Sequence, residues 1–215
     1  MPKPSLDKLP QARRRRIIRA CWVLFARHGY AGTSMKMIAS RLRVADGHLY
    51  YYFTGKDDLV VWVIDQSADI WMEFITDHLP LNDNIPLFDL YRRTLAASVR
   101  FIAAYRHLYG MYFQFINEPH FPHTAYLAKK TKWLDGLYRN ALENEIRMGR
   151  LCPMIPKEIV AMSLEVFRTR IEEFVYKPEI DPIGIAAFNE REFNRFADQI
   201  MGILQRGLAP ASLDL

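Results

Sequence analysis

The sequence predicts an all-α protein of about nine helices, with a small N-terminal domain and a larger C-terminal one. Apolar residues recur every three or four positions along most of the chain, which is the spacing of one helix face. Prolines, glycines and short polar runs interrupt this pattern, and no stretch alternates as a strand does. The chain has 215 residues, half of them hydrophobic, so it can bury the core that such a fold needs.

Three short helices are expected within the first 56 residues. The first runs from about Leu9 to Gly29, where glycine ends an apolar stripe. Thr33 or Ser34 can cap the second helix, because a hydroxyl oxygen accepts from a free amide of the first turn. The third helix covers Asp46–Tyr52 and ends at a Thr-Gly pair.

Six longer helices follow, each separated from the next by a break. Asp57 and Asp58 suit the first turn of the fourth helix, since carboxylates stabilise the positive end of a helix dipole. Pro86 suits the first turn of the fifth. The expected ranges are about 57–79, 86–105, 106–117, 123–148, 157–176 and 186–206.

The positive charge is concentrated near the N-terminus. Residues 1–56 hold twelve Lys and Arg and two acidic residues, a net +10, whereas the remainder carries −5. Such a segment attracts polyanions, because Lys and Arg release counterions when they bind phosphates. The run Arg13-Arg14-Arg15-Arg16 either contacts a DNA backbone or minor groove, or is a solvated helix start.

Composition also excludes several classes of protein. Cys21 and Cys152 are the only cysteines and cannot form a disulfide framework. No apolar run reaches the roughly 20 residues of a membrane helix, and no signal peptide opens the chain. We expect a cytoplasmic protein without a cofactor or metal, and the absence of catalytic motifs argues against an enzyme.

The second and third helices have the pattern of a helix-turn-helix. The residues spaced to form its small core are Leu42, Val44, Leu49 and Phe53. This leaves Asp46, Gly47, His48, Tyr50 and Tyr52 pointing outward. A short helix with exposed His and Tyr can enter the major groove, bind phosphates and base edges, and pack against thymine methyls.

Residues 13–60 resemble the TetR family of one-component transcriptional regulators. The matching runs are Phe25-Ala26-Arg27-His28-Gly29-Tyr30, Thr33-Ser34, Ile38-Ala39 and Leu49-Tyr50-Tyr51-Tyr52-Phe53-Thr54-Gly55-Lys56-Asp57-Asp58-Leu59. The resemblance implies a DNA-binding domain at residues 1–56 and a helical domain for ligand sensing and dimerisation at residues 57–215.

The resemblance also implies roles for single residues. It assigns DNA contacts to the start of the second helix (Thr33, Ser34, Lys36), to the third helix (Asp46, Gly47, His48, Tyr50, Tyr52) and to Lys56 at the fourth. A phosphate contact by Lys56 is physically reasonable, since a helix N-terminus already favours an anion. We add Arg13, Arg14 and Arg43 as basic residues that can reach the DNA backbone.

Two positions depart from the family pattern. Arg43 stands where the family often has glycine, so it has to tolerate the backbone of the turn, with φ > 0 as one option. Ala45 stands where the family often has Ser or Thr, so Asp46 is expected to cap the third helix instead. Facing DNA, Asp46 would repel phosphate or accept from cytosine N4.

The middle of the chain is rich in aromatic residues. The simplest interpretation is a packed core; the alternative is a cavity for an apolar or aromatic ligand, oriented by tyrosine hydroxyls. The family usually keeps its ligand there. The candidate lining residues are Trp71, Phe74, Phe101, Tyr105, Tyr109, Tyr112, Phe113 and Trp133.

These observations predict a ligand-released repressor. Similar proteins dimerise through their last two helices, and a two-fold dimer reads a palindrome with half-sites about 34 Å apart. A ligand would alter this spacing through the fourth helix, with a coupling of about 1–3 kcal/mol. The alternative is a helical binding protein whose basic segment meets a protein or a membrane surface.

Overall fold

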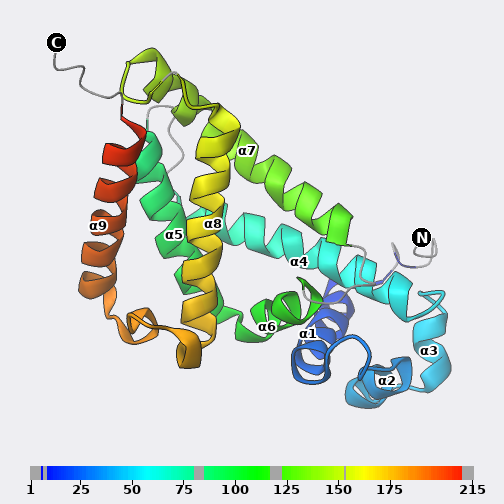
Figure 1. Cartoon of the computed structure of the whole chain (residues 1–215). Helices are drawn as coiled ribbons and strands as arrows, with labels where there is room; N and C mark the ends of the chain where they lie inside the picture. The colour runs from blue at the N-terminus through cyan, green and yellow to red at the C-terminus, as the bar shows by residue number, and fades with distance from the viewer. Residues whose placement is uncertain (1–5, 7–8, 80–84, 117–122, 153, 210–215) are drawn as a thin grey trace, which may run out of the picture. The chain divides into compact units, whose positions relative to one another are not determined.

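The computed structural model describes residues 6, 9–79, 85–116, 123–152 and 154–209, with the side chains of all of these except residues 116 and 123–131. Within these ranges all regular structure is helical, as predicted (Figure 1). The α-helices are α1 Gln11–His28, α2 Met35–Leu42, α3 Asp46–Tyr50, α4 Lys56–His78, α5 Leu87–Ala104, α6 Arg106–Ile116, α7 His123–Arg147, α8 Lys157–Tyr176 and α9 Glu190–Leu208.

Most helix ends lie within two residues of the prediction, and α9 is the main exception. It was expected from residue 186, but Ile185–Ala187 forms a separate 3-10 helix. The α-helix begins only after Asn189, whose side chain accepts from the Glu192 amide while the Glu192 carboxylate accepts from the Asn189 amide. This reciprocal capping box fixes the start of the helix more firmly than the apolar spacing does.

The chain forms two compact units, which we describe separately. Unit 1 comprises Met1–Met72 and Tyr105–Lys130, and unit 2 comprises Glu73–Ala104 and Thr131–Leu215. The helix α4 contributes residues to both units. The predicted domain boundary at residue 56 refers to function and stays a prediction. No helix in the described ranges is long and apolar enough to cross a bilayer.

In unit 1, α1 packs against α6 and α2. The rings of Phe25 and Phe115 lie 5.2 Å apart, and the Trp22 indole N–H donates to the Ser67 hydroxyl at 2.9 Å. Aromatic burial of this kind contributes much of a helical core. The helix α1 thus joins α2 and α3, which contact each other, to the aromatic core formed with α6.

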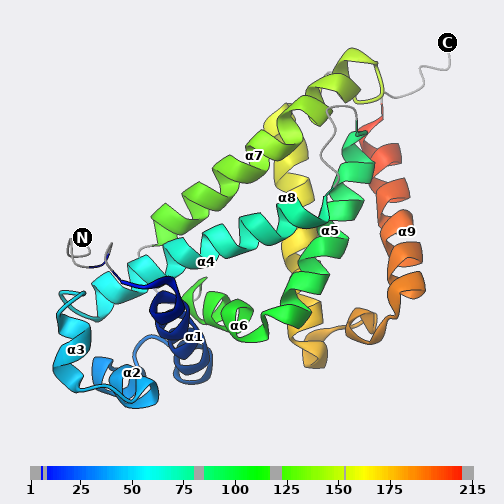
Figure 2. The same cartoon turned by 180° about the vertical axis from the view of Figure 1, so that it is seen from behind.

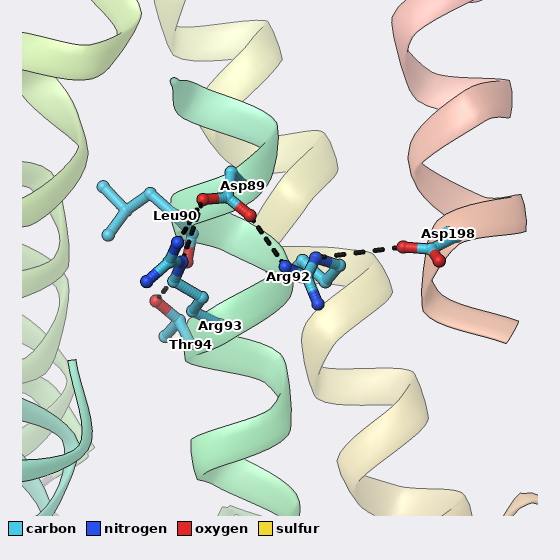
Figure 3. A network of polar contacts seen from close by, with 6 residues as sticks. All are labelled: Asp89, Leu90, Arg92, Arg93, Thr94 and Asp198. Carbon is cyan, nitrogen blue, oxygen red and sulfur yellow. Dashed lines mark hydrogen bonds and ion pairs between the residues drawn. The ribbon is translucent and has the colours of Figure 1, made fainter. Parts of the chain in front are cut away.

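In unit 2, α5 runs alongside α8 and α9 (Figure 1 and Figure 2). Arg92 lies 3.8 Å from Asp198 of α9, and one turn away on its own helix it pairs with Asp89 at 2.8 Å (Figure 3). Burial works to raise the pKa of Asp89, but hydrogen bonds from Arg92 and Arg93 outweigh it and hold that pKa below its ordinary value. Polar contacts therefore help to position α9 against α5.

Candidate DNA interface

The start of α2 is fixed by two hydroxyl residues with different tasks. The Ser34 side chain caps the helix by accepting from the Met37 amide at 3.2 Å, as predicted. The Thr33 side chain is buried and donates to the carbonyls of Gly29 and Leu24, at 2.8 and 3.3 Å. A DNA contact by the Thr33 side chain conflicts with this burial, because its hydroxyl secures the turn after α1. Ser34 remains exposed here.

The turn between α2 and α3 is a Schellman motif with an arginine in its left-handed position. Arg43 has φ 56° and ψ 48°, the one non-glycine residue with positive φ in the described part of the chain, which confirms the expected departure. Its amide bonds to the Ser40 carbonyl, and the Val44 amide bonds to the Ala39 carbonyl, at 3.0 and 3.1 Å. The exposed Arg43 side chain projects from this turn.

A second arginine braces the same turn from α1. The Arg16 guanidinium donates from Nη2 to the Leu42 carbonyl at 3.1 Å. This carbonyl belongs to the last turn of α2, where intrahelical partners are missing. Arg16 therefore connects α1 to the turn that orients α3, a role the charge pattern alone did not reveal.

The helix α3 is shorter than predicted and begins differently. Ala45 occupies the N-cap without a side-chain hydrogen bond, and Asp46 is the first helical residue. The prediction that Asp46 caps α3 is therefore wrong, because the helix starts one residue too early for it. Asp46 and Gly47 are exposed, so both remain available to a partner.

The three tyrosines at the end of α3 and directly after it differ from the predicted pattern at one position. Tyr50 and Tyr51 are 48% and 63% exposed, whereas Tyr52 is buried at 8%. The predicted outward orientation of Tyr52 is therefore wrong. Its ring meets Tyr51 edge-on at 4.9 Å, and it lies three residues after the fully buried Leu49. The three- and four-residue spacing that places Leu49 and Phe53 inside also places Tyr52 there. The same spacing could have identified Tyr51 as the second exposed ring.

His48 takes an intermediate position in α3. Its ring is half-buried and meets the Tyr52 ring edge-on at 5.5 Å. The Nε2 atom is buried and has no hydrogen-bond partner among the described residues. A base contact through Nε2 therefore requires the ring to rotate outward on binding.

Two of the predicted basic contacts already bond to the protein backbone. Arg14 is half-buried and donates to the carbonyls of Leu9 and Leu6, each at 3.0 Å. Lys56 donates to the Tyr30 carbonyl at 2.9 Å and lies over the Tyr30 ring, with 4.0 Å between Nζ and the ring centre. Arg13 and Lys36 are exposed, as a phosphate contact requires.

The N-terminus of α4 is held by its own acidic residues. The Tyr30 hydroxyl donates to Asp57, and Asp58 accepts from the Thr54 amide and hydroxyl at 2.9 and 3.1 Å. Carboxylates at this end of the helix complement its dipole. An anion that approaches Lys56 is therefore attracted by the start of α4 and repelled by the carboxylates of Asp57 and Asp58.

The eight predicted ligand residues fall in both units. Unit 1 holds Trp71, Tyr105, Tyr109, Tyr112 and Phe113, and unit 2 holds Phe74, Phe101 and Trp133. They are buried or half-buried and in part pack on one another: the rings of Tyr109 and Phe113 lie 5.2 Å apart, and those of Phe74 and Phe101 5.3 Å apart. Their packing is that of a core, and a cavity among them stays a prediction.

A capped scaffold helix, a tight turn and a short helix with exposed polar and aromatic groups form the arrangement of a helix-turn-helix DNA-binding protein. The family model "Bacterial regulatory proteins, tetR family" matches residues 17–62. The regulator RutR of Escherichia coli (strain K12) is 23% identical over 209 residues, covering 93% of this chain and 92% of RutR. The match to the tetR family model confirms the predicted resemblance over this N-terminal segment.

Two further comparisons give, first, a sequence match over part of the chain and, second, a likeness of fold over most of it. An uncharacterised regulator of Lactococcus lactis subsp. lactis is 32% identical over 75 residues, which span 35% of this chain and only 38% of that relative. The structure of FadR from Bacillus subtilis, in complex with stearoyl-CoA, has a TM-score of 0.71 at 14% identity and covers 91% of this chain and 99% of FadR. The likeness to FadR shows the shared fold.

Proposed function

We propose that this transcriptional regulator is a repressor that binds a palindromic operator as a homodimer and is released by a small apolar or aromatic ligand. The observation that carries the proposal is the braced turn at Arg43, which presents α3 with its exposed polar and aromatic residues. The alternative of a protein or membrane partner uses the positive charge but gives no reason for the geometry of α2 and α3.

The DNA contacts come from exposed groups around this turn. Lys36 and Arg43 supply phosphate contacts, and Gly47 and Tyr50 lie where α3 meets base edges. We add Tyr51, because it is the more exposed of the two outward rings. His48 joins them once its ring has turned outward.

The dimer interface is proposed on α8 and α9. Ile159, Met162 and Val166 recur at helical spacing on α8 and are 44%, 56% and 61% exposed. On α9, Ile203 is 57% exposed. A row of exposed apolar side chains is a typical sign of a protein interface. A two-fold axis through it would pair two recognition helices on one face of DNA.

Ligand release is proposed to act through α4. This helix contributes residues to both units, so a change in unit 2 can reach the helix-turn-helix through one continuous element. The stearoyl-CoA bound by FadR supports an apolar effector for this fold. A coupling of about 1–3 kcal/mol lowers operator affinity roughly 5- to 150-fold.

The experiment is selection of operators from random duplex DNA at about 150 mM salt, where non-specific binding is weak. We expect one enriched palindrome. Lys36→Gln should then weaken binding to this operator and to random DNA alike, whereas Tyr51→Ala should alter the preferred sequence. Lys132→Gln, at another exposed lysine that lies in unit 2, is the matched control and should change neither.

Two outcomes would contradict the proposal. Retention of DNA without any enriched sequence would show that the basic segment binds only phosphates. An enriched sequence without two-fold symmetry, or an unchanged dimer after Met162→Glu, would exclude the proposed assembly through α8.

A further inference from the structure

Tyr30, which lies just after α1, holds the first residue of α4 with its carbonyl and its ring. The Lys56 ammonium donates to the Tyr30 carbonyl at 2.9 Å, and Nζ lies 4.0 Å from the centre of the Tyr30 ring. The same carbonyl accepts from the Thr33 amide, shortly before α2, at 3.3 Å. Tyr30 thus connects the end of α1 to the starts of both α2 and α4.

The side chain of Tyr30 is fixed by further contacts with α4 and α6. Its hydroxyl donates to the Asp57 carboxylate, one residue beyond Lys56. Its ring is half-buried and meets the Phe115 ring of α6 edge-on, with 6.3 Å between the centres. The ring therefore offers Lys56 a fixed surface, because it cannot move aside without breaking these contacts.

These contacts hold Lys56 without neutralising it. The carbonyl and the ring are both uncharged partners, and among the described residues Lys56 forms no ion pair. The adjacent carboxylate of Asp57 is bound by the Tyr30 hydroxyl instead. The ammonium therefore keeps its charge and has a defined position, while the carboxylate beside it has a separate partner.

Lys56 can meet a phosphate without leaving Tyr30. A lysine ammonium has three N–H donors, of which one bonds to the Tyr30 carbonyl and another side faces the ring. This leaves at least one N–H for an anion, and the Lys56 side chain is only half-buried. Binding normally restricts the rotamers of a lysine, and a lysine that is ordered beforehand has already lost that freedom.

We propose that Tyr30 is a positioning residue for DNA binding, which orders Lys56 before a duplex arrives and keeps the Asp57 carboxylate away from the phosphate that Lys56 meets. Tyr30 acts through these two neighbours and does not itself need to touch DNA. The inference rests on the proposed function, and it adds a residue to which no DNA contact is assigned.

The test is a double-mutant cycle of Tyr30→Leu and Lys56→Gln in the full chain. Binding to a pool of random duplex DNA is measured by fluorescence anisotropy between about 50 and 200 mM salt. Lys56→Gln should weaken binding and lower the slope of log K against log salt by about 0.9, the value for one phosphate. Tyr30→Leu should weaken binding about 2- to 5-fold, the effect of one exposed cation–π contact, with an unchanged slope because Lys56 keeps its charge.

The double variant separates positioning from a general effect on the fold. If Tyr30 acts through Lys56, Tyr30→Leu should not weaken binding further once Lys56 has been replaced. A substitution that only loosens the DNA-binding helices would instead weaken binding by the same factor in both backgrounds. Each variant is first checked for a cooperative melt above the temperature of the binding assay.

Tyr30→Phe tests the hydroxyl by itself. It keeps the ring beside Lys56 but releases the Asp57 carboxylate, so affinity should fall about 2- to 3-fold, as expected for one exposed charge. Adding Asp57→Asn removes that charge, and it should raise the affinity of Tyr30→Phe more than it raises that of the wild type.

Tyr91→Phe is the matched control. It removes a tyrosine hydroxyl that donates to the Leu164 carbonyl at 2.7 Å within unit 2. It should lower thermal stability and leave both the DNA affinity and the salt slope unchanged.

Three results would overturn the inference. They are an unchanged affinity in Tyr30→Leu, an equal loss from Tyr30→Leu with and without Lys56, and an unchanged salt slope in Lys56→Gln. Failure of the proposed function gives a different result, namely no enriched palindrome in the operator selection. The cycle uses random DNA and does not depend on that selection.

Discussion

Replacing Arg43 by glycine should stabilise the protein and weaken its binding to DNA at the same time. The backbone of Arg43 is left-handed, at φ 56° and ψ 48°, and two Schellman hydrogen bonds hold it there. Its side chain is exposed beside the recognition helix. One residue thus combines a strained backbone with a charge directed at the proposed DNA face.

The expected magnitudes follow from this geometry. A non-glycine residue loses about 1–2 kcal/mol in the left-handed region. Glycine avoids this cost but gives back part of the gain, because it loses more entropy on folding. A net gain of about 0.5–1 kcal/mol corresponds to an increase in Tm of roughly 1–4 °C for a chain of this size. Loss of one phosphate contact should lower the slope of log K against log salt by about 0.9.

Thermal melts and DNA binding between about 50 and 200 mM salt measure the two effects separately. Arg43→Ala is the control, since it removes the charge but keeps the steric strain of a Cβ. It should share the lower salt slope of Arg43→Gly without the increase in Tm. An unchanged or lower Tm for Arg43→Gly would refute the strain argument, and an unchanged slope would remove Arg43 from the DNA interface.

Three further predictions concern other contacts. Arg16→Lys keeps the charge but loses the bond to the Leu42 carbonyl, so it should lower stability by about 0.5–1.5 kcal/mol in a denaturant titration, with an unchanged salt slope on random DNA. Tyr51→Phe removes a hydroxyl from the proposed DNA face and keeps the exposed ring. It should therefore lower operator affinity several-fold in a gel-shift assay without changing Tm. Glu145→Gln tests the bidentate bond from Arg150, at 2.7 and 2.8 Å, which holds the pKa of Glu145 below its ordinary 4.5. The stability that the Glu145 carboxylate contributes is complete above pH 4.5 and is lost as pH falls through the lower folded pKa, so melts of wild type and variant should converge in acid and differ at pH 7.

The helices could be predicted because their ends are marked by local chemistry. Gly29, Ser34 and Pro156 stand at helix boundaries where their backbone or side-chain preferences apply directly. Arg43 could be identified as unusual because the turn requires a conformation that favours glycine. The start of α9 was missed although the Asn189-x-x-Glu192 signature of a capping box was present.

The hydrogen-bond partners of individual basic side chains could not be predicted, because they depend on contacts between distant segments. Arg16 and Lys56 look like other basic residues in the sequence, yet each bonds to a carbonyl 26 residues away that the fold brings close. The wrong prediction for Tyr52 could have been corrected from its three-residue spacing after Leu49, which places both side chains on the same buried face. Arg168 gave a comparable signal, since it lies between the buried Leu164 and Ile171 on α8, where a solvated charge is not expected.

The bonds of Arg16 and Lys56 also bear on how affinity and specificity divide in this protein. Each donates to a neutral backbone carbonyl, so neither loses its positive charge in folding. These two charges therefore stay available to phosphates, in line with the excess of +10 that the sequence gives for residues 1–56. In the proposed function, sequence preference depends instead on the few groups that the Arg43 turn presents. Substitutions that disturb this turn without changing charge should reduce the ratio of specific to non-specific binding more than they reduce non-specific binding itself.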